Sequence, residues 1–274
     1  MAAAMKNLEG RVALVTGAGR LRGIGRAAAV ALAGHGADLA VTGTGRDPAT
    51  YPDDEKAAGW RDIESTAEQV RALGRRALAI RANVASDSDV RRTVAAAIEE
   101  FGRIDILVNN AAVARAEDRV PLVDLSEDLW RRVMDVKLTG SFLMCRAVLP
   151  SMIGRGEGGS IVNISSVAGK RPSPLMAVYA AANAGLDGFT RALAMEAAPH
   201  NIRVNAICPG MTDTSRMDSL GRGEAWESMV RQRIPLARAG RDEDVGGLIA
   251  WLCTPEASYI TGQSLNIDGG LVMG

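Results

Sequence analysis

A glycine-rich segment near the amino terminus is the first part of the chain whose residue types and spacing could do chemistry. Residues Thr16–Gly25 read TGAGRLRGIG, with a short apolar run before them and a helical pattern after them. Glycines let the backbone turn tightly and approach a pyrophosphate closely, and a helix start supplies free N–H groups and partial positive charge. The segment predicts a dinucleotide-binding loop. A glycine-rich turn without a ligand is the alternative, because the strict G-x-G-x-x-G spacing is absent.

Cysteines and histidines give little basis for other chemistry. Cys145, Cys208 and Cys253 are far apart and lack metal-ligand spacing, so we interpret them as reduced residues in or near the core. A catalytic thiol is the alternative, but the partners that a cysteine nucleophile needs are missing. His35 and His200 stand near expected helix ends, where capping or solvated roles are typical. We therefore expect no metal site.

The composition is that of one α/β domain. The chain has 274 residues, of which 47% are apolar, enough to cover a large sheet on both faces. The 32 basic and 32 acidic residues balance and form no block of like charge, which argues against nucleic acid or an anionic membrane as the main partner. Residues 1–10 are expected to be an N-terminal extension without a signal-peptide layout, and no apolar run reaches membrane-spanning length. These features predict a cytoplasmic protein.

Short apolar runs alternate with longer helical patterns along the chain. We expect strands at Val12–Thr16, Asp38–Thr42, Ala77–Arg81, Ile104–Val108, Ser160–Ile164, Arg203–Ile207 and Ser264–Ile267. We expect helices at Gly23–Ala33, Ile63–Leu73, Asp87–Phe101, Glu127–Met152, Met176–Ala197 and Asp242–Leu252. This alternation indicates right-handed βαβ units, and apolar strands indicate a sheet buried on both faces. The pattern predicts a single α/β domain over residues 11–274 with a doubly wound, mostly parallel, seven-stranded sheet.

Two segments interrupt this alternation. Residues 44–61 contain Pro48, Pro52 and Gly59 with mixed charge, and we expect a surface insertion there. Residues 211–235 follow the sixth strand and carry three methionines and a tryptophan. A mobile lid over a substrate would have this composition, and so would a packed surface helix, so both interpretations stay open.

Five further segments follow the glycine loop in a fixed order. They are Leu107–Ala112 (LVNNAA), Asn163–Ser166 (NISS) with Tyr179 thirteen residues after Ser166, Asn205–Gly210 (NAICPG) with Thr214, Thr261–Gln263 (TGQ) and Asp268–Gly270 (DGG). Together with the glycine loop, which has two extra residues, they resemble the motifs of the short-chain dehydrogenase/reductase family. The resemblance extends from Arg11 to Gly270. Any one motif could arise by chance, but this many in order and at these intervals form a specific signal.

The resemblance implies an enzyme with a Rossmann fold that transfers a hydride between NADP(H) or NAD(H) and a carbonyl or alcohol substrate. In that chemistry Tyr179 would exchange a proton with the substrate oxygen, and Ser166 would hold the same oxygen by a hydrogen bond. A buried packing tyrosine is the alternative for Tyr179. The serine-bearing strand before it argues against that alternative, because the site needs both groups together.

Two positions depart from the family pattern. Asn183 stands four residues after Tyr179, where the family has a lysine, and Lys137 stands where it has an asparagine. The resemblance therefore implies a catalytic tetrad of Lys137, Ser166, Tyr179 and Asn183 with two members exchanged. A cation about 5 Å from the phenol is worth roughly 3 kcal/mol at an effective dielectric near 20, or on the order of two pKa units. A neutral Asn183 cannot supply this, and we expect Lys137 to do so.

An ordinary surface lysine at position 137 is the alternative. The chain would then be a cofactor-binding protein of the same fold with little turnover, acting as a sensor or subunit partner. Cofactor binding without turnover on ketones and alcohols would favour that reading.

The resemblance also implies the cofactor site. Its residues are Gly17, Gly19, Arg20, Arg22, Gly23, Ile24, Gly25, Arg46, Asn83, Val84, Asn109, Ala111, Tyr179, Pro209, Gly210, Thr212 and Thr214. The segment between the second strand and Asp47 contains no acidic residue that could bind a ribose hydroxyl. It does contain Arg46, which, with Arg20 or Arg22 of the glycine loop, could pair with a 2′-phosphate. We therefore predict that NADP(H) is preferred over NAD(H). Asn83 stands where an aspartate is usual, and its carbonyl can accept the same adenine bond.

The expected partners are a small-molecule substrate and further copies of the chain. The substrate pocket would be lined from residues 112–115, 167–177 and 211–229, which are mostly small or apolar, with Arg115 and Arg171 as charge partners. Residues 177–198 are rich in alanine and glycine, and small residues let helices approach closely across a two-fold axis. This composition and the family resemblance predict a homo-oligomer, specifically a tetramer.

Overall fold

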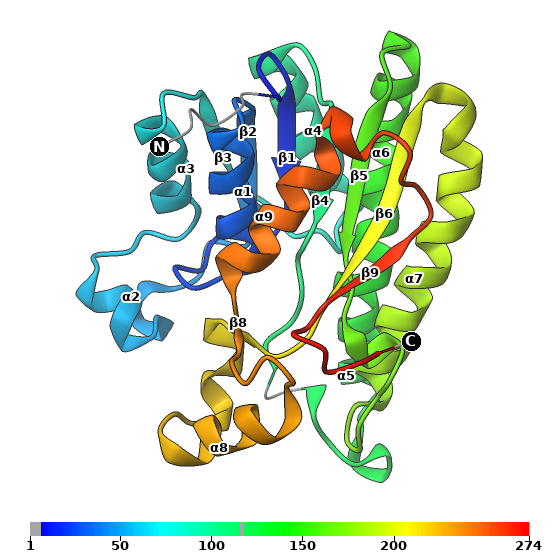
Figure 1. The fold of residues 1–274 in the computed structure, drawn as a ribbon. Coiled ribbons are helices and arrows are strands. Elements are labelled where there is room, and N and C mark those ends of the chain that lie inside the picture. Colours follow the sequence, from blue (N-terminus) through cyan, green and yellow to red (C-terminus); the bar gives the residue numbers. More distant parts are fainter. Residues whose placement is uncertain (1–6, 116–117, 274) are drawn as a thin grey trace.

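Seven parallel strands form the central sheet of the computed structural model, which describes residues 7–115 and 118–273 (Figure 1). The strands are β1 (Val12–Val15), β2 (Asp38–Gly43), β3 (Ala77–Arg81), β4 (Ile106–Asn109), β5 (Gly159–Ile164), β6 (Ile202–Pro209) and β9 (Ser264–Ile267). Their order is β3-β2-β1-β4-β5-β6-β9, so the strand order reverses between β1 and β4. The predicted doubly wound sheet is confirmed, and the seven strand boundaries differ from the predicted ones by at most two residues.

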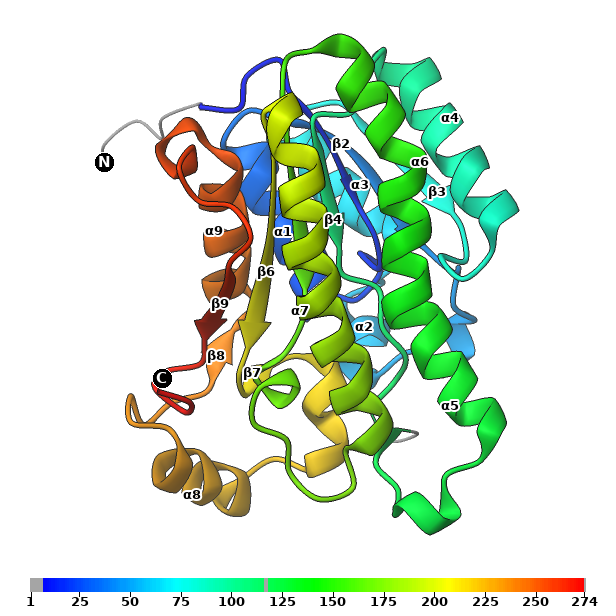
Figure 2. The same cartoon turned by 90° about the vertical axis from the view of Figure 1, so that its right-hand side faces the viewer.

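Helices cover both faces of this sheet (Figure 2). One face carries α1 (Ile24–Gly34), α3 (Ile63–Ala72) and α9 (Asp242–Cys253), and the other carries α4 (Asp87–Phe101), α6 (Gly140–Arg155) and α7 (Ala177–Ala197). Strand β1 shows why both faces are needed. Ala13 and Val15 pack into the core under α1, whereas Val12 and Leu14 pack into the opposite core, because successive strand residues point to opposite faces.

The helix predicted at Glu127–Met152 has an irregular turn inside it. It consists of α5 (Glu127–Met134), the π-helical turn η4 (Asp135–Thr139) and α6. By length and composition the continuous segment Glu127–Arg155 could cross a membrane, which corrects the expectation that no apolar run is long enough. Met144 and Met152 of α6 are nonetheless buried against the sheet, so the apolar side of this helix has a structural use inside the fold.

The two segments that interrupt the alternation have secondary structure of their own. Residues 44–61 form η1 (Pro48–Thr50) and α2 (Asp53–Ala57); most of their residues are exposed, but Tyr51, Glu55 and Trp60 are buried. Residues 211–235 form β7 (Thr212–Asp213), which pairs with β8 (Gly240–Arg241), then η7 (Ser215–Leu220) and α8 (Glu224–Arg233). Figure 1 shows α8 beyond the carboxyl ends of β6 and β9.

Short helical turns and the amino-terminal segment complete the described chain. The turns are η3 (Leu122–Asp124), η5 (Val167–Gly169), η6 (Ala198–His200) and η8 (Pro255–Ala257). Within the expected N-terminal extension, residues 1–6 lie outside the described part. Leu8 is buried, and its N–H donates to the carbonyl oxygen of His35 at 2.9 Å, so this segment is attached to the end of α1.

Candidate active site

Two adjoining cavities open near the carboxyl ends of the central strands, where the strand order reverses. One has a volume of about 620 Å³ and the other of about 680 Å³. Six residues line both of them: Ile24, Asn110, Ala112, Arg115, Thr214 and Arg216. Open α/β sheets bind ligands in the crevice at such a reversal, so the paired cavities are the candidate active site.

The glycine loop forms one wall of the larger cavity. Gly17 has a φ of 68°, and a Cβ atom there would lie 2.8 Å from Cα of Ala111, so only glycine lets the two backbones approach this closely. The Asn110 amide donates to the carbonyl oxygens of Thr16 at 3.0 Å and Gly17 at 2.9 Å, which holds the loop against the end of β4. A loop of this shape, lining a cavity at the start of α1, fits a dinucleotide.

Most residues predicted to bind the cofactor line these cavities. Those of the larger cavity are Gly17, Gly19, Arg20, Arg22, Gly23, Ile24, Arg46, Asn83, Val84, Ala111 and Thr214. Those of the smaller cavity are Ile24, Tyr179, Pro209, Gly210, Thr212 and Thr214.

Two predicted residues, Gly25 and Asn109, line neither of these cavities. A Cβ atom on Gly25 would lie 2.5 Å from the carbonyl oxygen of Gly17, so this glycine serves close packing behind the loop. The Asn109 amide is buried and donates to Oδ1 of Asn163 at 2.9 Å on the neighbouring strand. Because successive residues alternate across the sheet end, the next residue, Asn110, faces the cavities instead.

Buried residues of the segment after β2 hold the glycine loop from outside. The Glu55 carboxylate is completely buried and accepts hydrogen bonds from the Leu21 N–H at 3.0 Å and the Arg46 guanidinium at 2.7 Å. The indole N–H of Trp60 donates to the carbonyl oxygen of Gly19 at 2.7 Å. This segment therefore shapes the loop, a role that its polar, proline-containing sequence did not indicate.

The longer glycine loop places Arg22 among three carboxylates. Its guanidinium pairs with Asp54 at 2.6 Å, Asp213 at 3.2 Å and Asp218 at 2.8 Å. The N–H of Ser215 also donates to the Arg22 carbonyl oxygen at 2.9 Å. Arg22 therefore connects the loop to both irregular segments. Its charge is already neutralised, which makes it a poor partner for a cofactor phosphate.

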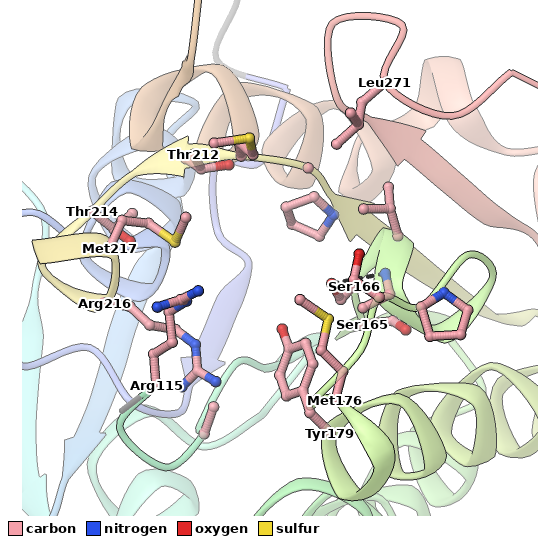
Figure 3. Close-up of a pocket in the computed structure, with 18 of the residues that line it drawn as sticks. Arg115, Ser165, Ser166, Met176, Tyr179, Thr212, Thr214, Arg216, Met217 and Leu271 are labelled. Atoms are coloured by element: carbon pink, nitrogen blue, oxygen red, sulfur yellow. Dashed lines mark hydrogen bonds between the residues drawn. The ribbon is translucent and has the colours of Figure 1, made fainter. Parts of the chain in front are cut away.

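Ser166 and Tyr179 line the smaller cavity together (Figure 3). Ser166 follows β5, and its Oγ accepts a hydrogen bond from the Ala168 N–H at 3.1 Å, which fixes the side chain. Tyr179 stands in the first turn of α7. Figure 3 shows its phenol between the Ser165–Ser166 segment and the side chain of Arg216. The pair predicted from the sequence thus shares one cavity.

Lys137 reaches the same cavity from the π-helical turn η4. Only 5% of the residue is exposed, and its Nζ donates to the carbonyl oxygen of Ile164 at the end of β5. Burial, with a smaller effect from the charge of Arg216, lowers the pKa of Lys137 to about 7. The alternative of an ordinary surface lysine is therefore wrong, and the side chain exchanges its proton near neutral pH.

Asn183 lies behind the cavity and does not line it. It is completely buried, its amide donates to the carbonyl oxygen of Tyr179 at 2.8 Å, and its Oδ1 has no hydrogen-bond partner among the described residues. The Oγ of Ser165 donates to the main-chain carbonyl oxygen of Asn183 at 3.3 Å. Of the predicted tetrad, the structure therefore brings Lys137, Ser166 and Tyr179 to one cavity and leaves Asn183 in the helix behind them.

Two arginines that belong to no sequence motif lie against Tyr179. The guanidinium carbon of Arg119 is 4.1 Å from the centroid of the phenol ring, and that of Arg216 is 5.0 Å from it. Both pair with Asp118, which is completely buried: Oδ1 lies 2.7 Å from Arg119, and Oδ2 lies 2.6 Å from Arg216. Arg216 and Asp118 are 98 residues apart in the chain, so no local pattern could have marked the group.

The cysteines are buried, as predicted from the sequence. Burial raises the pKa of Cys145 to about 12 and the pKa values of Cys208 and Cys253 to about 11, so all three are thiols at neutral pH. Within residues 7–115 and 118–273, no group of three or more His, Cys, Asp or Glu side chains could hold a metal ion.

Comparison with known proteins covers almost the whole chain. A family model described as enoyl-(acyl carrier protein) reductase matches residues 17–272. A 3-oxoacyl-[acyl-carrier-protein] reductase of Synechocystis sp. is 41% identical over 270 residues, which are 98% of this chain and 100% of the relative. A short-chain type dehydrogenase/reductase from Mycobacterium marinum has a TM-score of 0.82 at 31% identity, with 98% of each chain covered. Acetoin dehydrogenase from Enterobacter cloacae has a TM-score of 0.79 at 38% identity, with 97% of this chain and 96% of that one covered.

Proposed function

Because the chain belongs to the short-chain dehydrogenase/reductase family, we propose that Tyr179 exchanges the proton of a hydride-transfer reaction in the smaller cavity. The protein is an oxidoreductase that uses a nicotinamide cofactor and acts on a carbonyl or alcohol. The observation that carries the proposal is the shared cavity of Ser166 and Tyr179, whose wall also contains Pro209 and Gly210 of the predicted cofactor site.

The side chains divide the work on the substrate oxygen. A bound nicotinamide supplies or accepts the hydride. Ser166 Oγ accepts the Ala168 N–H through a lone pair, so its own hydrogen stays available to donate to the substrate oxygen. The Tyr179 hydroxyl gives its proton to that oxygen in reduction and takes it back in oxidation.

A single-atom deletion tests the role of Tyr179. Tyr179→Phe keeps the ring that Arg119 and Arg216 contact and removes only the hydroxyl. We expect kcat to fall by about a hundredfold or more, because general acid–base catalysis contributes on the order of 10² to 10⁴. Cofactor affinity should fall by much less than kcat, because Tyr179 is one of many residues predicted to bind the cofactor. Tyr259→Phe is the matched control, since Tyr259 is fully exposed. A Tyr179→Phe enzyme as active as wild type would refute the proposal.

We propose further that Lys137 supplies part of the positive charge beside Tyr179, which the neutral side chain of Asn183 cannot supply. Its place in the wall of the cavity that holds Tyr179 supports this role. Its pKa of about 7 means that the ammonium form is present mainly below neutral pH. Asn183 would then act by holding the start of α7 through its bond to the Tyr179 carbonyl oxygen.

We propose that the cofactor is NADP(H) in preference to NAD(H). Arg20 and Arg46 line the larger cavity, and Arg20 is the less neutralised of the two, with one ion pair to Glu55 at 3.9 Å. The competing group is Asp62, whose carboxylate lines the same cavity and could accept a ribose hydroxyl. Equilibrium titration should give tighter binding of NADP(H), and Arg20→Ala should remove most of the difference. Tighter binding of NAD(H) would indicate that Asp62 accepts the ribose hydroxyl, and it would refute the preference for NADP(H).

We propose that residues 211–235 form a lid over the substrate. Met211, Met217 and Met229 line the smaller cavity and pack with Trp226 in one apolar cluster, which supports a movable cap. Limited proteolysis in this segment should slow when cofactor and substrate analogue are both present. Equal cleavage rates with and without them would instead indicate a fixed surface helix.

We also propose a cytoplasmic homotetramer. Phe142 and Ile153 on α6 and Met195 on α7 are exposed apolar side chains on neighbouring helices, which supports assembly through this face. Light scattering at micromolar concentration should give four times the mass of the chain, and a monomer would end the idea. Three buried free thiols are compatible with a reducing compartment, which cell fractionation tests.

A further inference from the structure

Positive charge around Tyr179 exceeds negative charge in the described part of the chain. Arg115, Arg119 and Arg216 line the smaller cavity, and no aspartate or glutamate is among its described lining residues. The neighbouring carboxylate is that of Asp118, which lies beneath the cavity wall and pairs with Arg119 and Arg216. Among the described residues, two of these three guanidinium groups pair with one carboxylate, and Arg115 has no ion pair with it.

The donors of these arginines are only partly used. Nε of Arg119 is buried and has no hydrogen-bond partner among the described residues. Arg115 donates to a neutral group, the Ser219 hydroxyl, at 3.0 Å. Burial, and then the charge of Arg119, lowers the pKa of Arg115, as expected where like charges crowd together. Buried or half-buried cations are costly unless an anion pairs with them.

We propose that Arg115, supported by Arg119 and Arg216, binds an anionic group of the substrate. A guanidinium matches a carboxylate or a phosphate with two parallel hydrogen bonds, and both groups would balance the excess charge. The inference rests on the proposed function, because it concerns the same cavity. It narrows the substrate to an oxo acid, a phosphorylated ketone or the corresponding alcohol.

The position of the cluster limits the length of this substrate. Arg119 and Arg216 contact the ring of Tyr179, whose hydroxyl would meet the reacting oxygen. Figure 3 shows Arg115 beside Arg216 on the side of Tyr179 away from Ser166. The anionic group therefore lies close to the reacting carbon, and a compact molecule satisfies both contacts.

Matched pairs of carbonyl compounds test the charge directly. One pair is 4-oxopentanoate and its methyl ester, and the other is dihydroxyacetone phosphate and dihydroxyacetone. In at least one pair we expect kcat/KM to be about tenfold or more higher for the anion, because charge-assisted hydrogen bonds contribute roughly 1.5–3 kcal/mol and 1.4 kcal/mol is tenfold. The pair that shows the difference distinguishes a carboxylate site from a phosphate site.

A second readout does not depend on turnover. The same four compounds are titrated into the enzyme loaded with oxidised cofactor, where a ketone can bind but cannot be reduced. The preferred anion should again bind about tenfold more tightly than its neutral partner. Arg115→Gln should bring this ratio of binding constants close to one. Arg231→Gln is the control: it removes the same charge from an exposed arginine of α8 and should leave the ratio unchanged.

Two outcomes would overturn the inference. The first is that neither anion binds more tightly than its neutral partner; neutral ketones that are still reduced would then leave the hydride-transfer proposal intact. The second is that Arg115→Gln weakens cofactor binding as much as it weakens anion selectivity. Arg115 lines the larger cavity as well, and that result would assign its charge to the cofactor.

Discussion

Asn183 donates its side-chain amide to the main-chain carbonyl oxygen of Tyr179, 2.8 Å away and one helical turn earlier. The side chain that occupies the family's lysine position is therefore turned back on its own helix. Lys137 reaches the cavity from a different element, the π-helical turn η4, and donates to the carbonyl oxygen of Ile164. The two exchanged residues thus hold two different backbone segments, those that carry Tyr179 and Ser166.

Replacing Lys137 should affect catalysis most at low pH. Lys137→Met removes a cation that is present below its pKa of about 7 and largely absent above it. If that cation assists ionisation of Tyr179, kcat should fall by roughly a hundredfold at pH 6, from the two-unit effect of a nearby charge. The difference from wild type should shrink above pH 8. A pH–rate profile of alcohol oxidation measures this, with Lys56→Met as the exposed control. Identical profiles would show that Lys137 is not the cation.

The same replacement should increase stability, in a pH-dependent way. The folded pKa of Lys137, about 7, lies below its ordinary value of 10.5, so between these values the unfolded chain binds one more proton. Wild-type stability therefore gains from Lys137 as pH rises through this window. The free energy of unfolding of Lys137→Met should exceed that of the wild type, and this difference should narrow by about 1.4 kcal/mol per pH unit between pH 7 and 10. Urea unfolding at three pH values checks this, and a constant difference would contradict a buried ammonium.

The reciprocal exchange can be reversed by mutation. Asn183→Lys alone should lower kcat, because two amino groups near one cavity repel and one loses its proton. Lys137→Asn combined with Asn183→Lys rebuilds the family arrangement and should recover much of the activity. The measurement is the coupling free energy calculated from kcat of the wild type, Lys137→Asn, Asn183→Lys and the double variant. We expect this coupling free energy to exceed about 1 kcal/mol. Additive effects within about 0.3 kcal/mol would mean that the two positions act independently.

The sheet could be predicted from the sequence because each strand is a local apolar run between turn residues. Ser166 and Tyr179 could be predicted as well, because their spacing is a family motif. Asp118, Arg119 and Arg216 could not, since their association depends on segments 98 residues apart that meet only in the fold. The burial of Lys137 was equally hidden, because a π-helical turn changes which residues of a helix face inward.

The buried Asp118 should be required for both stability and the position of Tyr179. Asp118→Asn removes the carboxylate charge that pairs with Arg119 and Arg216. Breaking a buried ion pair on one side costs about 3 kcal/mol or more, so Tm should fall clearly. At a temperature where the variant is folded, kcat should still be reduced, because both arginines contact the Tyr179 ring. Asp128→Asn, on the exposed side of α5, is the control. Full activity in the folded variant would show that the arginines do not position the tyrosine.

Glu55 should link the insertion after β2 to cofactor affinity. Its carboxylate is completely buried and accepts the Leu21 N–H of the glycine loop at 3.0 Å and the Arg46 guanidinium at 2.7 Å. Glu55→Gln keeps the shape and removes the charge, so Arg46 loses its closest anion and the loop loses a charge-assisted hydrogen bond, worth roughly 1.5–3 kcal/mol.

The cofactor dissociation constant of Glu55→Gln should therefore rise about tenfold, while kcat at saturating cofactor changes less, because Ser166 and Tyr179 lie in the other cavity. Fluorescence titration of the reduced cofactor gives the first quantity and steady-state kinetics the second. Glu64→Gln, an exposed carboxylate on α3, should alter neither. Unchanged affinity combined with a lower Tm would show that Glu55 supports the fold alone and that the glycine loop holds its shape without the insertion.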